Sequence, residues 1–472
     1  MSRPIERILP LVVATALFME TMDSTILATA LPAIARDLGV DPIALKLAIT
    51  SYLVGFAVVV PVSGWLADRL GARTAFRSAL GVFMAASIGC AFSNSLEGFV
   101  FWRFAQGMGG ALMTPIGRLV LVRAISKDKL IAALATVTIP ALIGPAIGPP
   151  LGGFIVTYFD WRWIFFVNLP MCLIGLIMAT LYFPSERHET PPLDIKGWLL
   201  MAIGLTCLIA GAASAGQHVA PLHVSLGAFA AGLASLWAYV RHARVHPEPL
   251  LDLRLFAIPA FDAGVVGGAI FRFGVGASSF LVPLMLQLGF GLDALTSGLI
   301  TFTGALGALI MKFFAPSILA AASFRRVLMF NGIAASALVG SVAFVGPQTP
   351  HAAISALLLV TGMLRSLQFT SLHAITYSDI GEREAPAATS IASVVQQVSL
   401  SLGVAVGALA LELSQRFNAH AAPLAGDYSA ALVIVAALSS LCVLRLARLP
   451  ADAGRALSGK TAMQAAEEAG HP

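Results

Sequence analysis

Charged residues are scarce in this chain of 472 residues: only 11% are charged, whereas 58% are apolar. Soluble domains carry about 25% charged residues, so this chain has less than half the charge that a soluble surface uses. Crossing a bilayer takes ~20 apolar residues, and fourteen crossings would occupy about 280. The remainder suffices only for connections and short tails. The composition therefore predicts an all-α integral membrane protein without a soluble domain.

Several chemical signatures are also missing. No G-x-x-x-x-G-K-[ST] phosphate loop occurs, which argues against direct use of ATP. The four cysteines (Cys90, Cys172, Cys207 and Cys442) lie in apolar stretches and form no C-x-x-C pair, so we expect no metal site and no redox chemistry. We also expect no cofactor and no enzymatic activity. The net charge of +5 is ordinary for a protein with cationic cytoplasmic loops and does not indicate nucleic-acid binding.

Apolar runs predict fourteen spans. They are expected at 8–31, 45–67, 75–94, 98–122, 131–157, 163–183, 197–216, 222–240, 260–287, 294–315, 328–346, 352–375, 387–411 and 428–446. If the chain starts in the cytoplasm, only four of its 29 Lys and Arg residues fall outside and four lie within spans, which leaves 21 on the cytoplasmic side. The positive-inside rule therefore predicts that both termini are cytoplasmic.

The expected spans divide as six, two and six. We predict a six-helix half at 1–184, a linker with two extra helices at 185–257, a second six-helix half at 258–449 and a cytoplasmic tail at 450–472. In this division the loop after the second span corresponds to the loop after the tenth span. Both loops carry basic residues, which in the second case are Arg325-Arg326. Duplicated halves around a midplane site are typical of secondary transporters.

That second-span loop reads Gly64-Trp-Leu-Ala-Asp68-Arg69-Leu-Gly71-Ala-Arg73. Its glycines permit close helix approach and a tight turn. The carboxylate of Asp68 can meet a helix N-terminus or a neighbouring arginine.

Two acids, Glu20 and Asp23, lie inside the first span, and Arg103 opens the fourth span ahead of Gln106-Gly107. At ~1.5 Å per residue, Asp23 lies about 12 Å from the outer end of its span, Glu20 about 16 Å and Arg103 about 8 Å. Asp23 and Arg103 can therefore meet in the outer half of the bundle. An intramembrane arginine needs such a partner, either as a static structural pair or as part of a proton site.

The fifth span contains Gly144-Pro-Ala-Ile-Gly148-Pro149-Pro-Leu-Gly152-Gly153. Glycines four residues apart present a bare backbone face to a partner helix. Prolines remove helical hydrogen bonds and bend the span.

These stretches resemble the major facilitator superfamily, and within it the fourteen-span drug/proton antiporters (EmrB/QacA-like), most of all the multidrug-resistance D-type members of Gram-negative bacteria. The resemblance runs from Met19 to about Leu446. It implies that the Gly64–Arg73 loop is a cytoplasmic latch, although Ala72 stands where the family usually has a base. It also implies proton coupling through Asp23 and Arg103, and antiport rather than uptake from the Gly144–Gly153 motif. Glu20, one turn from Asp23 and near the midplane by helical rise, is a further proton-coupling candidate because a buried carboxyl there can exchange a proton.

Arg272 and Arg365 come out near the midplane of the second half. Either they pair with Glu20 and Asp23 across the halves, or they bind an anionic group of the substrate. Nearby polar side chains either add hydrogen bonds to a substrate or hold helices together; these are Gln287, Gln368, His373, Gln396 and Gln397.

The leading hypothesis is a proton-coupled exporter of lipophilic drugs or toxic compounds that works by alternating access. An exporter of one metabolite, such as an organic anion, an amino-acid derivative or a siderophore, is the alternative. A non-transporting membrane sensor or scaffold is an alternative of another class. We expect a monomer in the bacterial inner membrane whose partners are a small-molecule substrate, protons and lipid.

Overall fold

The computed structural model describes residues 3–125, 127–185, 187, 190, 192–214, 220–381, 384–420, 422–450 and 453. Over these ranges every regular element is a helix. The chain forms two compact units, one of Met1–Leu250 with Leu286–Phe302, and one of Leu251–Met285 with Thr303–Pro472. Most of the expected tail, 450–472, lies outside the described residues.

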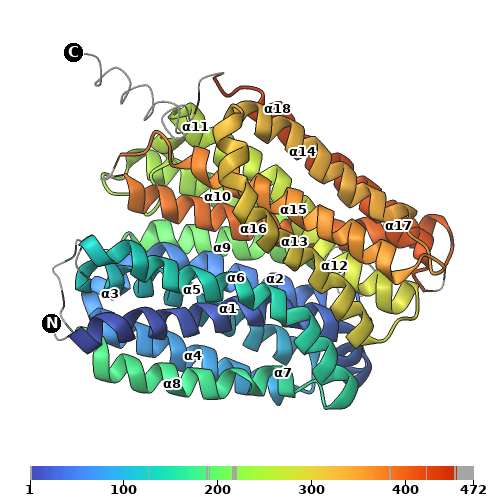
Figure 1. Ribbon diagram of the computed structural model, residues 1–472, viewed down its shortest axis with the longest axis horizontal. Helices are drawn as coiled ribbons and strands as arrows, with labels where there is room; N and C mark the ends of the chain where they lie inside the picture. Colours follow the sequence, from blue (N-terminus) through green and yellow to red (C-terminus); the bar gives the residue numbers. More distant parts are fainter. Residues whose placement is uncertain are drawn as a thin grey trace. The chain divides into compact units, whose positions relative to one another are not determined.

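The first unit holds the helices of the amino-terminal half of the chain (Figure 1). They are α1 (Arg3–Leu38), α2 (Lys46–Val59), η1 (Val60–Val62), α3 (Ser63–Leu70), α4 (Ala72–Ala91), α5 (Leu96–Ala124), α6 (Lys127–Tyr158), α7 (Trp163–Phe166), α8 (Asn168–Tyr182), α9 (Ile195–Ser214) and α10 (Leu222–Val245).

The second unit holds most of the remaining helices, and the boundary between the units runs through η4 and α13. The helices are η2 (Leu253–Ala257), α11 (Pro259–Asp262), η3 (Ala263–Gly267), α12 (Gly268–Leu284), η4 (Met285–Gly289), α13 (Ala294–Ala321), α14 (Phe324–Ser341), η5 (Val342–Phe344), α15 (His351–Thr376), α16 (Ala385–Phe417), α17 (Ala425–Ser440) and α18 (Cys442–Leu446).

Each of the fourteen expected apolar segments overlaps a helix, although 215–216, at the end of the seventh segment, lie outside the described residues. Among the described residues, 12 helical segments are long and apolar enough to cross a membrane. The helices α5 and α6, of 29 and 32 residues, are not among these twelve. Arg103 and Arg118 lower the mean hydropathy of α5, and several side chains of α6 lie outside the described residues. The structure therefore establishes an all-helical, multi-span membrane protein with twelve candidate spans.

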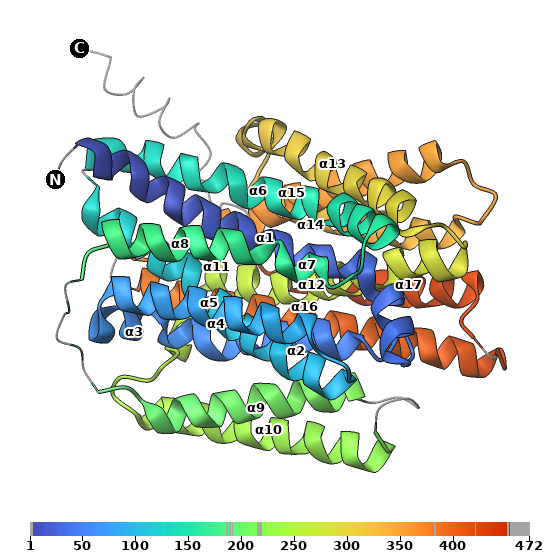
Figure 2. The ribbon, with the colours of Figure 1, turned by 90° about the horizontal axis from the view of Figure 1, so that it is seen from below.

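Helix packing in the first unit brings together segments that are far apart in the sequence. The helix α1 packs on α5, α6 and α8, and α4 packs on α5 and α8. The core between them is apolar and fully buried, with Phe76, Phe83 and Met113 at 0% exposure. The helices α9 and α10 lie side by side as an antiparallel pair (Figure 2), and α9 also contacts α2.

Glycines set the spacing of α2 and α5. A Cβ on Gly55 would collide with the carbonyl oxygen of Phe104, and one on Gly107 with that of Tyr52. Only helices that lack side chains at these positions can approach so closely. Because α2 and α5 are this close, the ring of Tyr52 on α2 lies next to Arg103 on α5.

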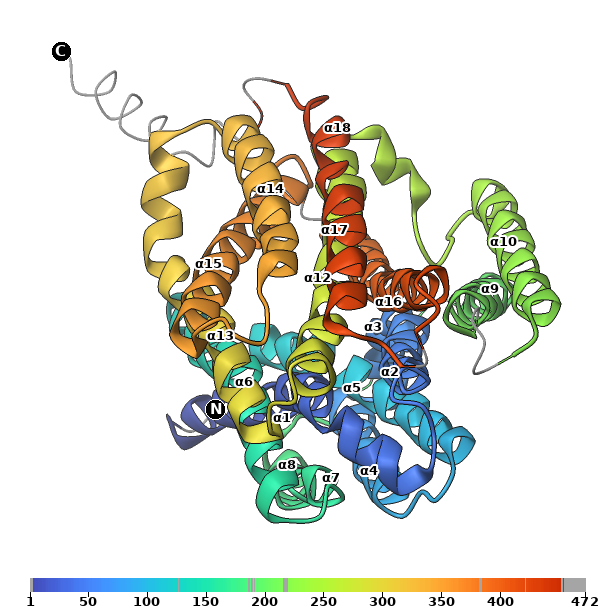
Figure 3. The same ribbon diagram turned by 90° about the vertical axis from the view of Figure 1, so that its right-hand side faces the viewer.

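In the second unit, α12 packs on α16 and α17, and α14 packs on α15 and α17 (Figure 3). Glycine again sets a contact, because a Cβ on Gly362 in α15 would collide with the carbonyl oxygen of Gly304 in α13. These helices carry Arg272 and Arg365.

Candidate functional site

A buried ion pair joins α1 to α5. Arg103 Nη1 lies 2.8 Å from Asp23 Oδ2, and the two side chains are 2% and 1% exposed. The side chain of Ser95 accepts a hydrogen bond from Gly98 N and so caps α5, which fixes Arg103 two turns into the helix. Because a buried charge without a partner costs several kcal/mol, the pair accounts for both residues being inside the bundle.

Three further side chains complete a network around Asp23. Gln106 Nε2 donates to Asp23 Oδ1 at 2.9 Å and to Ser87 Oγ at 2.9 Å, and Asn168 Nδ2 donates to Asp23 Oδ1 at 2.7 Å. Gln106 Oε1 in turn accepts a hydrogen bond from Arg103 Nη1. The helices α1, α5 and α8 thus meet at one carboxylate, which receives three hydrogen bonds, and α4 joins the network through Ser87.

The ring of Tyr52 covers the other side of Arg103. The guanidinium carbon lies 4.5 Å from the ring centroid, a distance at which a cation is attracted to an aromatic face. The Tyr52 hydroxyl has no hydrogen-bond partner among the described residues. A Cβ on Gly110 would lie 3.0 Å from this hydroxyl and 3.4 Å from Glu20 Cγ, so Tyr52 and Glu20 flank the same glycine.

The Glu20 carboxylate is held by weaker hydrogen bonding than the Asp23 carboxylate. Its side chain is buried, with 9% exposure for the residue. It accepts a long hydrogen bond of 3.4 Å at Oε2 from Thr114 Oγ1. One turn of α1 therefore carries two buried carboxylates, one held by three donors and one held weakly.

The glycines of α6 face a row of threonines on α1. Gly144, Gly148 and Gly152 lie against the hydroxyls of Thr21, Thr25 and Thr29, and a Cβ on any of these glycines would collide with its threonine. Both rows repeat every four residues, so they run along one face of each helix. The bare backbone face expected from the sequence points to the helix that carries Glu20 and Asp23.

Gly153 faces the first turn of α13 instead. A Cβ there would collide with Ala294 O, and one on Gly298 would collide with Pro149 O. Gln287 Nε2 donates to Thr29 O at 3.1 Å. Gln287, a candidate for substrate contact or for holding helices together, thus forms a hydrogen bond to the backbone of α1 within the first unit.

The segment expected as a loop after the second span is mostly helical, formed by the end of α3 and the start of α4 around Gly71. Arg123 Nη1 lies 2.7 Å from Asp68 Oδ1, and Arg73 Nε donates to Phe183 O at 2.7 Å. Gly71 has φ +86°, a conformation in which a side chain would be strained. Arg69 is exposed, and nothing lies within 4 Å of a Cβ placed on Gly64. Asp68 therefore meets a neighbouring arginine, one of its two expected partners.

Two arginines stand without carboxylate partners in the described part of the second unit. Arg272 is 6% exposed, its Nε has no hydrogen-bond partner there, and its guanidinium carbon lies 5.5 Å from the Phe369 ring centroid. Arg365 is half-buried, and no salt bridge to it occurs in the same ranges. Asp23, one of the acids expected as a partner across the halves, is paired with Arg103.

The remaining polar candidates differ in their surroundings. Gln368 is fully buried, accepts from Asn331 Nδ2 at 2.9 Å and donates to Leu328 O at 3.1 Å, as expected for a residue that holds α14 to α15. His373 is exposed, whereas Gln396 and Gln397 are half-buried on α16. Sequence reasoning did not place Ser87, Tyr52, Thr114 or Asn168 in the site. Gln106 stands in the motif that Arg103 opens, whereas Ser87, Tyr52 and Thr114 carry no motif signal.

Long apolar helices that bury paired charges define a multi-pass membrane protein of the transporter class. The chain belongs to the Major Facilitator Superfamily, whose family model matches residues 13–404.

Relatives and folds of known structure agree with this assignment. The chain is 34% identical over 446 residues to multidrug resistance protein MdtD of Klebsiella pneumoniae (strain 342), covering 94% of each chain. It is also 34% identical over 448 residues to the protein of that name from Citrobacter koseri, covering 93% of this chain and 94% of that one. A D-xylose-proton symporter shares the fold with a TM-score of 0.66 at 14% identity, covering 95% of this chain and 98% of that chain. An auto-inhibited POT family peptide transporter has a TM-score of 0.67 at 15% identity, covering 93% and 96%.

Proposed function

We propose that this protein exports lipophilic drugs or toxic compounds in exchange for protons, by alternating access. The observation that carries the proposal is the pair of buried acids on α1, where Asp23 is bonded to Arg103 and Glu20 is held weakly. The relatives named multidrug resistance protein supply the substrate class. No catalytic step, cofactor or nucleic acid is part of this function.

In this proposal Asp23 and Arg103 couple protonation to helix position. The Asp23 carboxylate receives hydrogen bonds from α5 and α8. Protonating it would weaken all three bonds together, because charge-assisted hydrogen bonds are roughly twice as strong as neutral ones. The change would free α1 from α5 and α8, which is the kind of local event that can bias a rocking transition.

Glu20 is the proposed site of proton exchange with the transport pathway. The side chain has one long hydrogen bond to Thr114, and Asp23 and Arg118 are the charges that act on it. A carboxyl with so few donors can take up and release a proton without dismantling a network. In this proposal the weakly held Glu20 exchanges the proton, and the strongly held Asp23 responds through its hydrogen bonds.

The face shared by α1 and α6 is the proposed surface along which helix movement occurs. Threonine hydroxyls against bare glycines make a contact without interlocking side chains. The Asp68–Arg123 pair and the Arg73–Phe183 bond are proposed to stabilise one end of the cycle as the cytoplasmic latch. The partly exposed Asp68–Arg123 pair suits a contact that must break, because such pairs contribute only ~0–1 kcal/mol.

The membrane arrangement is part of the proposal. We place fourteen spans in the inner membrane, the twelve apolar segments plus α5 and α6, with both termini cytoplasmic and a monomer as the working unit. The halves would be 1–184 and 258–449, with α9 and α10 as the extra pair in 185–257.

A second candidate function is the export of an organic anion. Arg272 is buried, and it has no carboxylate partner in the described ranges. A desolvated arginine is costly until a ligand neutralises it. A protein retained only as a sensor or scaffold is the weaker alternative, because the motif acids, the motif arginine and the antiporter glycines are all present.

The test uses purified full-length protein in liposomes that contain the pH dye pyranine. Vesicles are loaded with ethidium or, in parallel, with fluorescein disulfonate, and efflux is started by dilution. Proton-coupled drug export predicts that ethidium leaves while the lumen acidifies, and that a protonophore abolishes the pH change. Efflux without a pH change would contradict proton coupling, and absence of efflux for both probes would contradict export of these classes.

A further inference from the structure

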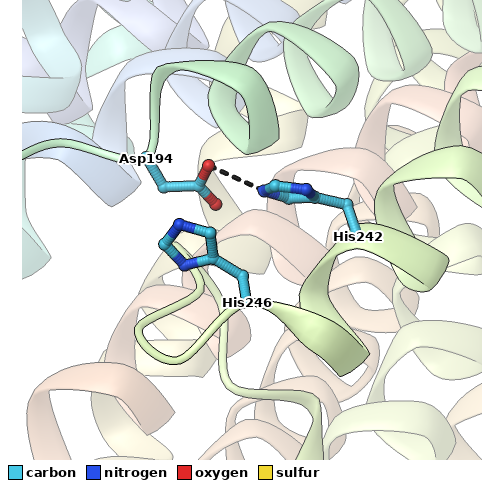
Figure 4. Close-up of side chains that lie close together, drawn as sticks. All are labelled: Asp194, His242 and His246. Atoms are coloured by element: carbon cyan, nitrogen blue, oxygen red, sulfur yellow. Dashed lines mark hydrogen bonds and ion pairs between the residues drawn. The ribbon is translucent and has the colours of Figure 1, made fainter.

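Two histidines and one aspartate come together where α9 begins and α10 ends. Asp194 directly precedes α9, His242 lies in the last turn of α10, and His246 follows that helix (Figure 4). One ligand atom from each residue lies within 4.8 Å of the other two. All three residues belong to the first unit.

Part of this cluster has an ordinary structural explanation. Asp194 Oδ1 accepts a hydrogen bond from Gly197 N at 2.8 Å, which caps α9, and it lies 2.8 Å from His242 Nε2. A helix cap with one ion pair would account for this oxygen and for His242. It accounts for neither the second oxygen of Asp194 nor the position of His246.

The second oxygen is the unexplained group. The Asp194 side chain is 4% exposed, and its Oδ2 is buried without a hydrogen-bond partner among the described residues. A buried acceptor left unpaired is costly and calls for a partner. The ring centroids of His242 and His246 lie 5.1 Å apart, and His246 Nδ1 accepts a long hydrogen bond of 3.3 Å from Glu248 N.

We propose that Asp194, His242 and His246 bind a divalent transition-metal ion of the Zn²⁺ class. Imidazole and carboxylate are ligands that zinc prefers, and three protein ligands plus water complete its tetrahedral shell. Ligand atoms about 2.1 Å from the ion in this geometry are roughly 3.4 Å apart. The 2.8 Å separation of His242 Nε2 from Asp194 Oδ1 and the 4.8 Å limit for the cluster are each within about 1.5 Å of that value. Mg²⁺ and Ca²⁺ are disfavoured because two of the three ligands are nitrogens.

The ion would fasten the ends of two helices that already pack closely along their length. Along their length α9 and α10 meet through Gly204, Gly211 and Gly232, and by a hydrogen bond of 2.7 Å from Ser235 to Leu200 O. His246 is also close in sequence to Leu251, where the chain enters the second unit. Metal binding would fix the extra helix pair at this exit, and this inference does not depend on the proposed transport function.

The experiment measures Zn²⁺ binding to full-length protein purified with a tag that contains no histidine and stripped with EDTA. Isothermal titration should give one ion per chain. His246→Ala and Asp194→Asn should each weaken binding at least tenfold, a loss that even substitutions around a ligand set can reach. Asp194→Asn keeps a side-chain oxygen for Gly197 N, so helix capping persists while the charged ligand is lost. Co²⁺ should give visible absorption bands with the wild type that are absent in both variants.

The matched control is His223→Ala at the opposite end of α10, where the side chain is exposed. This control should bind Zn²⁺ like the wild type. Folding is checked by the elution profile of every variant in detergent. The proposal is overturned if the wild type binds no stoichiometric Zn²⁺, or if well-folded His246→Ala and Asp194→Asn variants bind it as tightly as His223→Ala does.

Discussion

Arg103 and Asp23, 80 residues apart in the sequence, lie with Nη1 and Oδ2 2.8 Å apart and almost no exposure to solvent. Removing one partner of such a pair leaves an uncompensated charge, which costs about 3–5 kcal/mol. The pair therefore joins α1 to α5 through two opposite buried charges. The first prediction follows from it.

Asp23→Asn should abolish proton-coupled efflux while the protein still folds into the membrane. Asparagine preserves the shape and one acceptor for Gln106 and Asn168 but cannot change charge. Efflux measured in the liposome assay should fall at least tenfold under a proton gradient. Asp37→Asn on the same helix is the control, because the Asp37–Arg162 pair is partly exposed and contributes little. Coupled efflux at the wild-type rate in Asp23→Asn would refute the role.

Glu20→Gln should have a milder effect that appears mainly in the pH dependence. If Glu20 exchanges the proton, its amide variant should exchange substrate across the membrane at a rate that varies less with pH than that of the wild type. Counterflow of ethidium between pH 6 and pH 8.5 measures this difference. Thr114→Val is the matched control, because it removes only the 3.4 Å hydrogen bond and keeps the titrating carboxyl. An unchanged pH profile in Glu20→Gln would exclude Glu20 as the exchanging group.

Gly148→Ala should reduce efflux about tenfold or more, because its methyl group would collide with Thr25 Oγ1 on α1. Thr25→Ala alone should be tolerated, and the double variant should recover part of the lost efflux, since the colliding oxygen is gone. Coupling of this kind is what a double-mutant cycle measures for residues in contact. Gly227→Ala on α10 is the control, because nothing lies within 4 Å of a Cβ there. Lack of any recovery would show that another contact limits the cycle.

Arg272→Gln and Arg365→Gln separate the two candidate substrate classes. If the arginines bind an anionic group, export of fluorescein disulfonate should fall at least tenfold in each variant while ethidium export changes little. Arg326→Gln, at the exposed start of α14, controls for the loss of one positive charge. Equal loss of both probes would instead indicate a structural role, and no loss of either would remove these residues from the site.

Asp293→Ala should destabilise the start of α13 by about 1 kcal/mol, the usual cost of losing a helix cap. Asp293 accepts from Thr296 N at 2.9 Å and from Thr296 Oγ1 at 2.6 Å, and these bonds hold its pKa below the ordinary value. A lowered pKa in the folded state adds stability at neutral pH that disappears as the pH falls through that pKa. Asp293→Asn keeps the cap without the charge. The wild type should therefore unfold at a higher temperature than Asp293→Asn at pH 7, and this difference should disappear as the pH falls to 3. A gap between these two that is constant with pH would contradict the assignment.

The sequence by itself was enough for the membrane class, the superfamily and the position of the helices. An apolar run of bilayer length crosses the membrane as a helix, because a helix satisfies every backbone N–H and C=O group by hydrogen bonds within the segment. For this reason the expected segments overlap helices, including α5 and α6, the two that separate the twelve candidate spans from the fourteen expected. The pairing of Asp23 with Arg103 was also accessible, since helical rise fixes the depth of each residue in its span.

The sequence did not reveal which side chains from other helices would complete the site. Ser87 and Tyr52 carry no motif, and they reach Gln106 and Arg103 only because glycine contacts set the spacing and rotation of α2, α4 and α5. The grouping of Asp194, His242 and His246 was not predicted for the same reason, because cysteine spacing gives no sign of it and Asp194 and His242 are 48 residues apart. Hydrophobic length depends on each segment alone and can be read along the chain, but the facing of one helix toward another depends on both helices and is decided only when they pack.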